Sequence, residues 1–205
     1  MYFKKAKWWL KALYPSFVWN MSRDEKTIYL TFDDGPHAFA TPFVLEQLKL
    51  YNAKATFFCI GKNVVQYPAL YEKIISEGHS TGNHTQHHLN GWNTNNNKYI
   101  NDVNAAAMHI SSNLFRPPYG RIKRQQAKQL ISNNAALKII MWDVLSGDFD
   151  TTITPEQCLT TVLKHTENGS IVVFHDSDKA WDRMQYALPK VLEYFSTKGY
   201  TFKAL

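Results

Sequence analysis

Strand-like and helix-like patterns alternate along almost the whole chain, and short connections separate them. Runs of apolar, β-branched and aromatic residues predict seven strands, over residues 27–33, 54–60, 79–83, 113–117, 137–143, 170–175 and 200–204. Helical periodicity fills the gaps, over residues 41–51, 63–77, 97–111, 121–134, 155–167 and 183–198. This alternation indicates an α/β protein with a parallel sheet, either open and doubly wound or closed as a barrel.

Ionisable residues stand at the ends of five predicted strands, and their placement favours the barrel. They are Asp33 and Asp34 after the first strand, His84 after the third, Arg116 in the fourth, residues 143–148 beyond the fifth, and His175 in the sixth. In parallel barrels the chemistry collects at the C-terminal ends of the strands, because the following loops build that face. An open sheet would spread these ends along about 25 Å or more. We therefore predict a seven-stranded (β/α) barrel with a site at its mouth.

Length and composition predict one globular, monomeric domain over residues 23–205, preceded by a basic aromatic segment over residues 1–22. No apolar run is long enough to cross a membrane, and the net charge is +6. Four of the cations lie in the first twenty residues without any acid: Lys4, Lys5, Lys7 and Lys11. The basicity belongs largely to this segment and does not predict a nucleic-acid partner. Two isolated cysteines, Cys59 and Cys158, are expected to be free, buried thiols.

Two interpretations of the N-terminal segment remain open. It resembles a signal peptide only loosely, because lysines interrupt its apolar part and no cleavage site follows. One interpretation is a helix packed across the bottom of the domain by Trp8, Trp9, Leu13 and Phe17. The other is a weak contact with a membrane surface, with tryptophans at the headgroups and lysines on anionic lipid. The compartment is left open between cytoplasm, membrane surface and cell envelope.

The paired carboxylates Asp33 and Asp34 suggest a metal ion, because adjacent acids repel one another unless a positive charge lies beside them. His84 and His88 have the i, i+4 spacing that brings two imidazoles to one side of a helical turn, whereas His87 points elsewhere. An Asp and two His are a sufficient ligand set for a catalytic zinc.

Each group also has a structural interpretation. The two aspartates could belong to a turn, Arg116 could form a surface ion pair, and His175 could be a satisfied core histidine. Their joint placement at five strand ends favours a functional site.

Five segments carry a resemblance to a known family. Residues 31–36 (TFDDGP), 84–88 (HTQHH), 116–119 (RPPY), 143–149 (DVLSGDF) and 173–175 (VFH) resemble the five ordered motifs of the polysaccharide deacetylases, the NodB-homology domain of carbohydrate esterase family 4. The resemblance implies a distorted (β/α) barrel and a divalent metal ion, usually zinc. It also implies a reaction, the removal of acetyl groups from N-acetylated sugars.

The resemblance implies a role for each matching residue. Asp33 matches the catalytic base and Arg116 its partner, while His175 matches the acid and Asp148 its partner. The remaining matches are Asp34, His84 and His88 as metal ligands, Thr85 as a support of the histidine motif, and Tyr119 as the residue whose backbone N–H faces the oxyanion.

Two departures concern the acyl pocket. Phe149 stands where the family commonly has tryptophan, and Val173 where it commonly has leucine, so the acyl group or sugar accepted is expected to differ. The predicted function is metal-dependent removal of N-acetyl groups from N-acetylglucosamine-type glycans, in peptidoglycan or chitin-like oligomers. The alternatives are a metal-dependent hydrolase of a small amide or cyclic ureide, and a non-catalytic glycan-binding domain.

Overall fold

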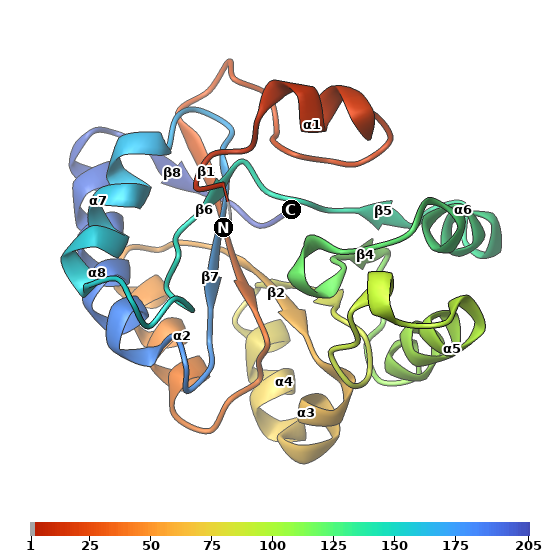
Figure 1. The fold of residues 1–205 in the computed structure, drawn as a ribbon. Helices are drawn as coiled ribbons and strands as arrows, with labels where there is room; N and C mark the ends of the chain where they lie inside the picture. Colours follow the sequence, from red (N-terminus) through yellow and green to blue (C-terminus); the bar gives the residue numbers. More distant parts are fainter. Residues whose placement is uncertain (1–2) are drawn as a thin grey trace.

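A computed structural model describes residues 3–205, and its centre is a curled parallel sheet (Figure 1). The sheet has the strand order β5-β4-β3-β2-β1-β7-β6, and β8 pairs with the beginning of β1. The strands are β1 (Thr27–Asp33), β2 (Thr56–Cys59), β3 (Ser80–Asn83), β4 (Leu114–Phe115), β5 (Lys138–Ile139), β6 (Val144–Leu145), β7 (Ile171–His175) and β8 (Thr201–Phe202). The predicted barrel of seven parallel strands is confirmed, in the distorted form of a curled half-barrel.

One stretch of chain forms both edges of this sheet. At β5 it pairs with β4, and at β6, five residues further on, it pairs with β7. The predicted strand over residues 137–143 is therefore two short strands joined by a bend. Because the same stretch continues from one edge to the other, the sheet curls round and brings its strand ends together.

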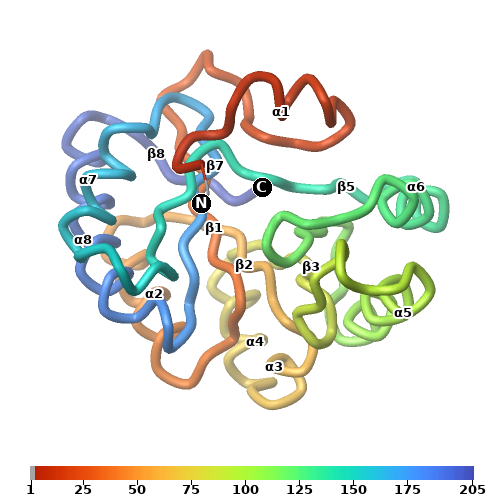
Figure 2. The backbone as a smooth tube through the Cα atoms, in the orientation of Figure 1, coloured from red at the N-terminus to blue at the C-terminus, as the bar shows by residue number. Residues whose placement is uncertain are grey.

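Helices surround the sheet, as the tube in Figure 2 shows. They are α1 (Trp8–Leu13), α2 (Ala40–Leu50), α3 (Gly61–Gln66), α4 (Pro68–Ser76), α5 (Asn96–Ala107), α6 (Arg124–Asn133), α7 (Pro155–His165) and α8 (Trp181–Thr197). The predicted helix over residues 63–77 is divided at Tyr67, because Pro68 lacks an N–H and begins a new helix. Within the described residues, no helix has the length and apolar character needed to span a membrane.

Apolar side chains fill both sides of the sheet. Phe32 on β1 stacks between Phe57 and Phe174, with ring centroids 5.1 and 6.1 Å away. Cys59 and Cys158 are buried in the same core and are free, as predicted. Burial on both faces fits strands that read as continuous apolar runs.

The N-terminal segment is held by backbone bridges and by Phe17 and Trp19, not by Trp8 and Trp9. Lys5 forms a β-bridge with Val144 and Val18 forms one with Ile140, both on the stretch that joins the two sheet edges. Asn20 forms a third bridge, with Ser170. Phe17 is buried as predicted, but the expected packing of the other three side chains is wrong: Trp8 is 79% exposed, Trp9 46% and Leu13 47%. α1 lies between two anchored segments, and this geometry turns much of its apolar surface towards solvent.

A buried carboxylate fastens the segment to the sheet. Asp143 accepts hydrogen bonds from three cations, at 2.8 Å from Lys5, 3.0 Å from Lys11 and 2.9 Å from Arg23, and from Ser170 at 2.7 Å. Burial would raise the pKa of Asp143, but these partners hold it well below its usual range.

We expect Asp143→Ala to lower the free energy of unfolding by about 3 kcal/mol, because it leaves three half-buried cations without their shared carboxylate. Since the folded-state pKa is depressed, the stabilisation is fully present above the unfolded pKa of about 3.9 and is lost as the pH falls below it. Urea denaturation at pH 7 and at lower pH measures this. Glu25→Ala, which breaks the exposed Glu25–Lys203 pair, is the control and should change stability by less than about 1 kcal/mol. Equal effects of the two substitutions would contradict the role given to Asp143.

Candidate active site

Arg116 is fully buried and holds the Asp33 carboxylate at the end of β1. Its guanidinium donates a hydrogen bond to Asp33 at 2.6 Å and lies 4.1 Å from the centre of the Phe58 ring. The remaining donors bind the Thr31 hydroxyl and the carbonyls of Ile140 and Met141. A buried arginine with its donors satisfied fixes the position and charge of its carboxylate partner. The alternative of a surface ion pair is therefore wrong.

A buried acid shapes the turn after β1. Asp34 adopts a left-handed backbone with φ of 85°, and the carboxylate of Asp176 accepts a hydrogen bond from the Gly35 N–H at 3.0 Å. A Cβ atom on Gly35 would lie 2.1 Å from that carboxylate, so only glycine fits here. Thr41 donates a second hydrogen bond to Asp176, whose pKa is raised to about 8, chiefly by burial. Sequence reasoning assigned no role to Asp176, although it directly follows His175.

Three side chains converge into a candidate metal site. Asp34, His84 and His88 each offer one ligand atom, and the three atoms lie within 4.8 Å of one another. The Asp34 oxygen is 3.2 Å from His88 and 3.7 Å from His84, yet it is buried without a hydrogen-bond partner. An orphaned carboxylate oxygen facing two imidazole nitrogens is suited to a divalent ion.

The two histidines do not reach this arrangement on a helical turn, as their spacing had suggested. Residues 84–90 form an irregular loop, with left-handed φ values of 66° at Thr85 and 57° at His88. The side chain of Asn83 accepts a hydrogen bond from the Thr85 N–H at 2.8 Å and so supports the first bend. Two backbone bends, rather than helical periodicity, turn both imidazoles towards Asp34.

Asp102 on α5 orders the rest of this loop. Its carboxylate accepts hydrogen bonds from the N–H groups of Gln86 and His87, both at 3.0 Å, and lies 2.6 Å from the His87 ring. His87 is otherwise exposed, in agreement with its predicted position away from the ligands. A single acid in a polar helix gave no sequence signal for this role.

The protonation states of the candidate ligands suit a metal ion. Nδ1 of His84 lies 2.8 Å from the Arg116 carbonyl, which can only accept, so Nδ1 carries the proton and Nε2 keeps its lone pair. Burial lowers the pKa of His84 to about 4, despite the charge of Asp33. Burial would raise the pKa of Asp34, but the adjacent His88 ring and the charge on His175 hold it well below its usual range. A neutral imidazole and a charged carboxylate are the forms that bind metals.

His175 at the end of β7 is paired with the fully buried Asp148. Its Nδ1 lies 2.8 Å from one carboxylate oxygen, and its backbone N–H donates to the other at 2.7 Å. Burial would lower the pKa of His175, but the charge and hydrogen bond of Asp148, aided by Asp34, raise it to about 10. The imidazole is therefore protonated at neutral pH.

Asp33, His175 and the three candidate metal ligands border one cavity of about 480 Å³. Tyr119 stands at its edge with a left-handed φ of 60°, and its ring centre lies 4.6 Å from that of His88. Phe149 and Val173 also line the cavity, and so do Arg121, Trp142, Leu145 and Lys179, to which sequence reasoning gave no role. Since His175 lines this cavity beside the candidate ligands, the alternative of a satisfied core histidine is wrong.

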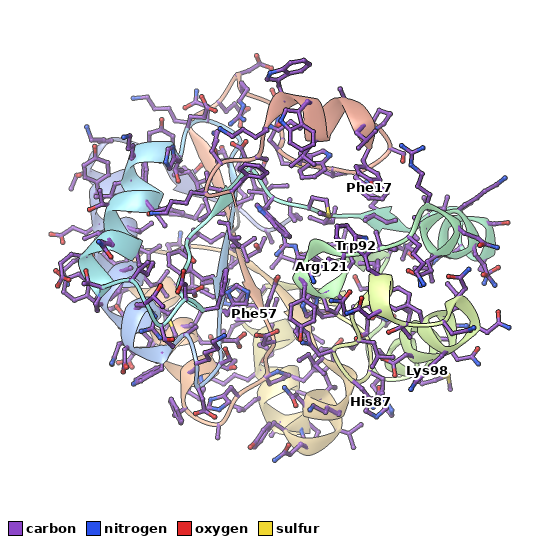
Figure 3. The ribbon with its side chains drawn as sticks, in the orientation of Figure 1. Phe17, Phe57, His87, Trp92, Lys98 and Arg121 are labelled. Carbon is purple, nitrogen blue, oxygen red and sulfur yellow. The ribbon has the colours of Figure 1, made fainter. Side chains whose placement is uncertain are left out.

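Arg121 extends the rim of the cavity towards Trp92. Its guanidinium carbon lies 5.2 Å from the centre of the indole ring, and Figure 3 shows the two side chains side by side. Residue types alone could not reveal this contact, because 28 residues separate the two positions in the sequence.

The sequence pattern of a known family, described as polysaccharide deacetylase, matches residues 20–137. The chain belongs to the polysaccharide deacetylase family. The family predicted from the five motifs is thereby confirmed.

Relatives within the polysaccharide deacetylase family match most of the chain. A peptidoglycan-N-acetylglucosamine deacetylase of Bacillus cereus is 34% identical over 94% of this chain and 93% of its own length. A chitooligosaccharide deacetylase of Azorhizobium caulinodans is 32% identical over 79% of this chain and 81% of its own length. Among solved structures, a peptidoglycan N-acetylglucosamine deacetylase crystallised with a naphthyl-substituted N-hydroxybenzamide superimposes with a TM-score of 0.83 and 29% identity. That match covers 93% of this chain and 91% of the other.

Proposed function

We propose that this protein hydrolyses the N-acetyl groups of N-acetylglucosamine-type glycans, in peptidoglycan or chitin-like oligomers. One observation carries the proposal: a carboxylate fixed by arginine, a histidine protonated through an aspartate and a three-ligand cluster border the same cavity. Amide hydrolysis needs a base, an acid and a means of stabilising the oxyanion, and this constellation can supply them. The named activities of the relatives support the same substrate class.

Asp34, His84 and His88 would hold a divalent ion, which we propose to be zinc. When bound there, such an ion would polarise the acetyl carbonyl and lower the pKa of water. The orphaned Asp34 oxygen and the free Nε2 of His84 fit this role. The solved relative offers further support, because its bound N-hydroxybenzamide carries a hydroxamate, a metal-chelating group.

The chain's own residues would then move the protons. Asp33, held by Arg116, accepts a proton from the attacking water while oxygen bonds to the acetyl carbon. The backbone N–H of Tyr119 donates a hydrogen bond to the oxygen that becomes negative. His175 gives its proton to the nitrogen as the carbon–nitrogen bond breaks, and Asp148 stabilises the protonated imidazole beforehand.

An apolar wall beside His175 would receive the acetyl methyl group. The Phe149 ring lies 5.2 Å from the imidazole at an interplanar angle of 72°, and Val173 and Leu145 line the same cavity. Phenylalanine keeps a flat apolar surface but lacks the indole N–H that tryptophan would supply.

We expect Phe149→Trp to change substrate preference more than stability. The larger ring should alter the ratio of kcat/KM for an acetylated and a longer acylated glucosamine oligomer by about 10-fold, since one methylene in an apolar pocket is worth roughly that much. Thermal melting should remain close to that of the parent. If this ratio were the same in Phe149→Trp and in the parent, Phe149 would not contribute to the acyl pocket.

Acetate release over a panel of substrates tests the proposed function. Chitohexaose and peptidoglycan should release acetate, whereas small amides and cyclic ureides should not react. Ring opening of a small substrate without acetate release from glycans would favour a hydrolase of small amides or cyclic ureides. Glycan binding without any turnover at full metal occupancy would favour a non-catalytic glycan-binding domain.

A further inference from the structure

Two stretches of the chain contain no acidic residue. Residues 1–23 and 103–142 together contain eleven Lys and Arg and no Asp or Glu, while the rest of the chain contains twelve Lys and Arg and seventeen Asp and Glu. The two stretches pack against each other in one core cluster, in which Phe17 and Trp19 meet Phe115, Leu130 and Ile139. Four of the eleven cations are paired with acids from elsewhere in the chain, Lys5, Lys11 and Arg23 with Asp143 and Arg116 with Asp33. The other seven leave an excess of positive charge on this part of the molecule.

The first stretch exposes an aromatic surface. The N-terminal aromatic patch consists of Phe3, Trp8, Trp9 and Leu13, all of them at least 46% exposed and Trp8 the most at 79%. The rings of Phe3 and Trp9 meet edge to face at 6.1 Å, and Lys7 lies over Phe3. α1 stands outside the sheet at the top of Figure 1. Trp8, Trp9 and Leu13 therefore belong to a projecting helix, and Phe3 to the segment that precedes it. Large apolar side chains that gather on the surface mark an interaction site.

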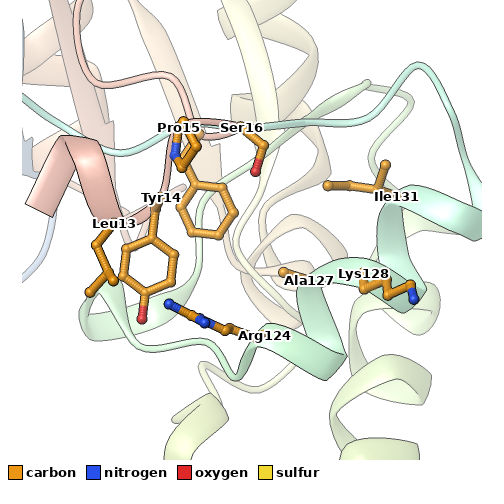
Figure 4. Close-up of a pocket in the computed structure, with 9 residues that line it drawn as sticks. Leu13, Tyr14, Pro15, Ser16, Arg124, Ala127, Lys128 and Ile131 are labelled. Atoms are coloured by element: carbon orange, nitrogen blue, oxygen red, sulfur yellow. The ribbon is translucent and has the colours of Figure 1, made fainter.

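A groove of about 320 Å³ continues this patch towards α6. Leu13 lies at its near end, and the Tyr14 and Phe17 rings stack at 5.1 Å along it. Figure 4 shows Arg124 beneath the Tyr14 ring and Lys128 further along α6. Among residues 3–205, neither Arg124 nor Lys128 forms a salt bridge, so both cations remain available to a partner.

We propose that α1 and α6 dock this protein on a bilayer surface that contains anionic phospholipid. Tryptophans prefer the headgroup layer, and cations beside them bind acidic lipid, each strengthening the attachment about fivefold. The patch projects from a short helix and includes the aliphatic Leu13, which suits insertion among lipids better than stacking on nucleic-acid bases. Arg121 at the rim of the catalytic cavity precedes Arg124 by three residues, so the docking surface adjoins the candidate active site.

Vesicle sedimentation of the full chain tests this proposal. The parent should bind to vesicles of phosphatidylcholine with 30% phosphatidylglycerol. It should bind much more weakly to vesicles of phosphatidylcholine alone. Trp8→Ala/Trp9→Ala should weaken binding at least about 10-fold through lost apolar contact, and Arg124→Gln/Lys128→Gln about 30-fold through lost charge. Matched controls are Leu50→Ala, which removes an exposed apolar side chain on α2, and Lys190→Gln/Lys198→Gln at α8. Both should bind as the parent does.

Four outcomes would overturn the proposal. They are absence of binding to the acidic vesicles, equal binding to neutral vesicles, unchanged binding of both the tryptophan and the Arg124/Lys128 double variants, and tighter binding to duplex DNA than to acidic vesicles. Acetate release from soluble chitohexaose should be the same for the parent and the Trp8→Ala/Trp9→Ala variant. Docking is thereby measured separately from catalysis.

Discussion

Replacing Asp33 or His175 by asparagine should lower kcat by at least about 100-fold while one metal ion per chain stays bound. Each residue is proposed to transfer a proton, and a general acid or base typically contributes about 10²–10⁴-fold. Neither belongs to the cluster of Asp34, His84 and His88. Steady-state acetate release and metal analysis of the same preparations measure both quantities. Because Asp33→Asn leaves the buried Arg116 without a carboxylate, its melting temperature should also fall, and rates are compared well below it.

The pH profile separates the two roles. With Asp148 and Asp34 raising its pKa to about 10, His175 stays protonated well above the ordinary imidazole value of about 6.5. The alkaline limb of kcat/KM should therefore lie on the alkaline side of neutrality in the parent and disappear in His175→Asn. Loss of metal from Asp33→Asn would identify Asp33 as a ligand, and a near-parental rate in His175→Asn would mean that the leaving nitrogen is protonated elsewhere.

His84→Ala and His88→Ala should each weaken metal binding by more than about 100-fold and abolish turnover. Substitutions that merely disturb a metal ligand's hydrogen-bond partner already cost 10–100-fold, so removing a ligand should cost more. His87→Ala is the matched control, because this imidazole belongs to the same loop but bonds to Asp102 and is largely exposed. It should keep the metal ion.

Isothermal titration with zinc, together with circular dichroism, distinguishes loss of the site from loss of the fold. The expected pattern is a native spectrum in all three variants and strong zinc binding in His87→Ala only. Full zinc occupancy in both His84→Ala and His88→Ala would eliminate the proposed site.

Strand pattern and motif order were enough to predict the fold and most of the ionisable residues that meet at its mouth. Apolar β-branched runs located the strands, and the ends of β1 and β7 are paired directly, Asp33 opposite His175. The sequence could not show how the sheet edges are joined, because one apolar run over residues 137–143 looks like a single strand. Its bend depends on partners at both edges, which are remote in sequence.

Contacts between remote residues account for the other differences. The i, i+4 spacing of His84 and His88 fits a helix, but bonds from Asn83 and Asp102 to the loop backbone impose another path. Trp8 has a strongly apolar side chain, yet its burial depends on where the flanking backbone is anchored. Local patterns carry no information about such tertiary bonds.

Acetate release by metal-depleted protein, titrated with zinc in the presence of chitohexaose, tests the central claim most directly. We predict that the depleted protein is inactive, that activity rises linearly and reaches its plateau at one zinc per chain, and that Asp33→Asn takes up the same zinc without gaining activity. Full acetate release by the depleted protein, or restoration of Asp33→Asn to the parental rate by zinc, would contradict the proposed catalytic centre.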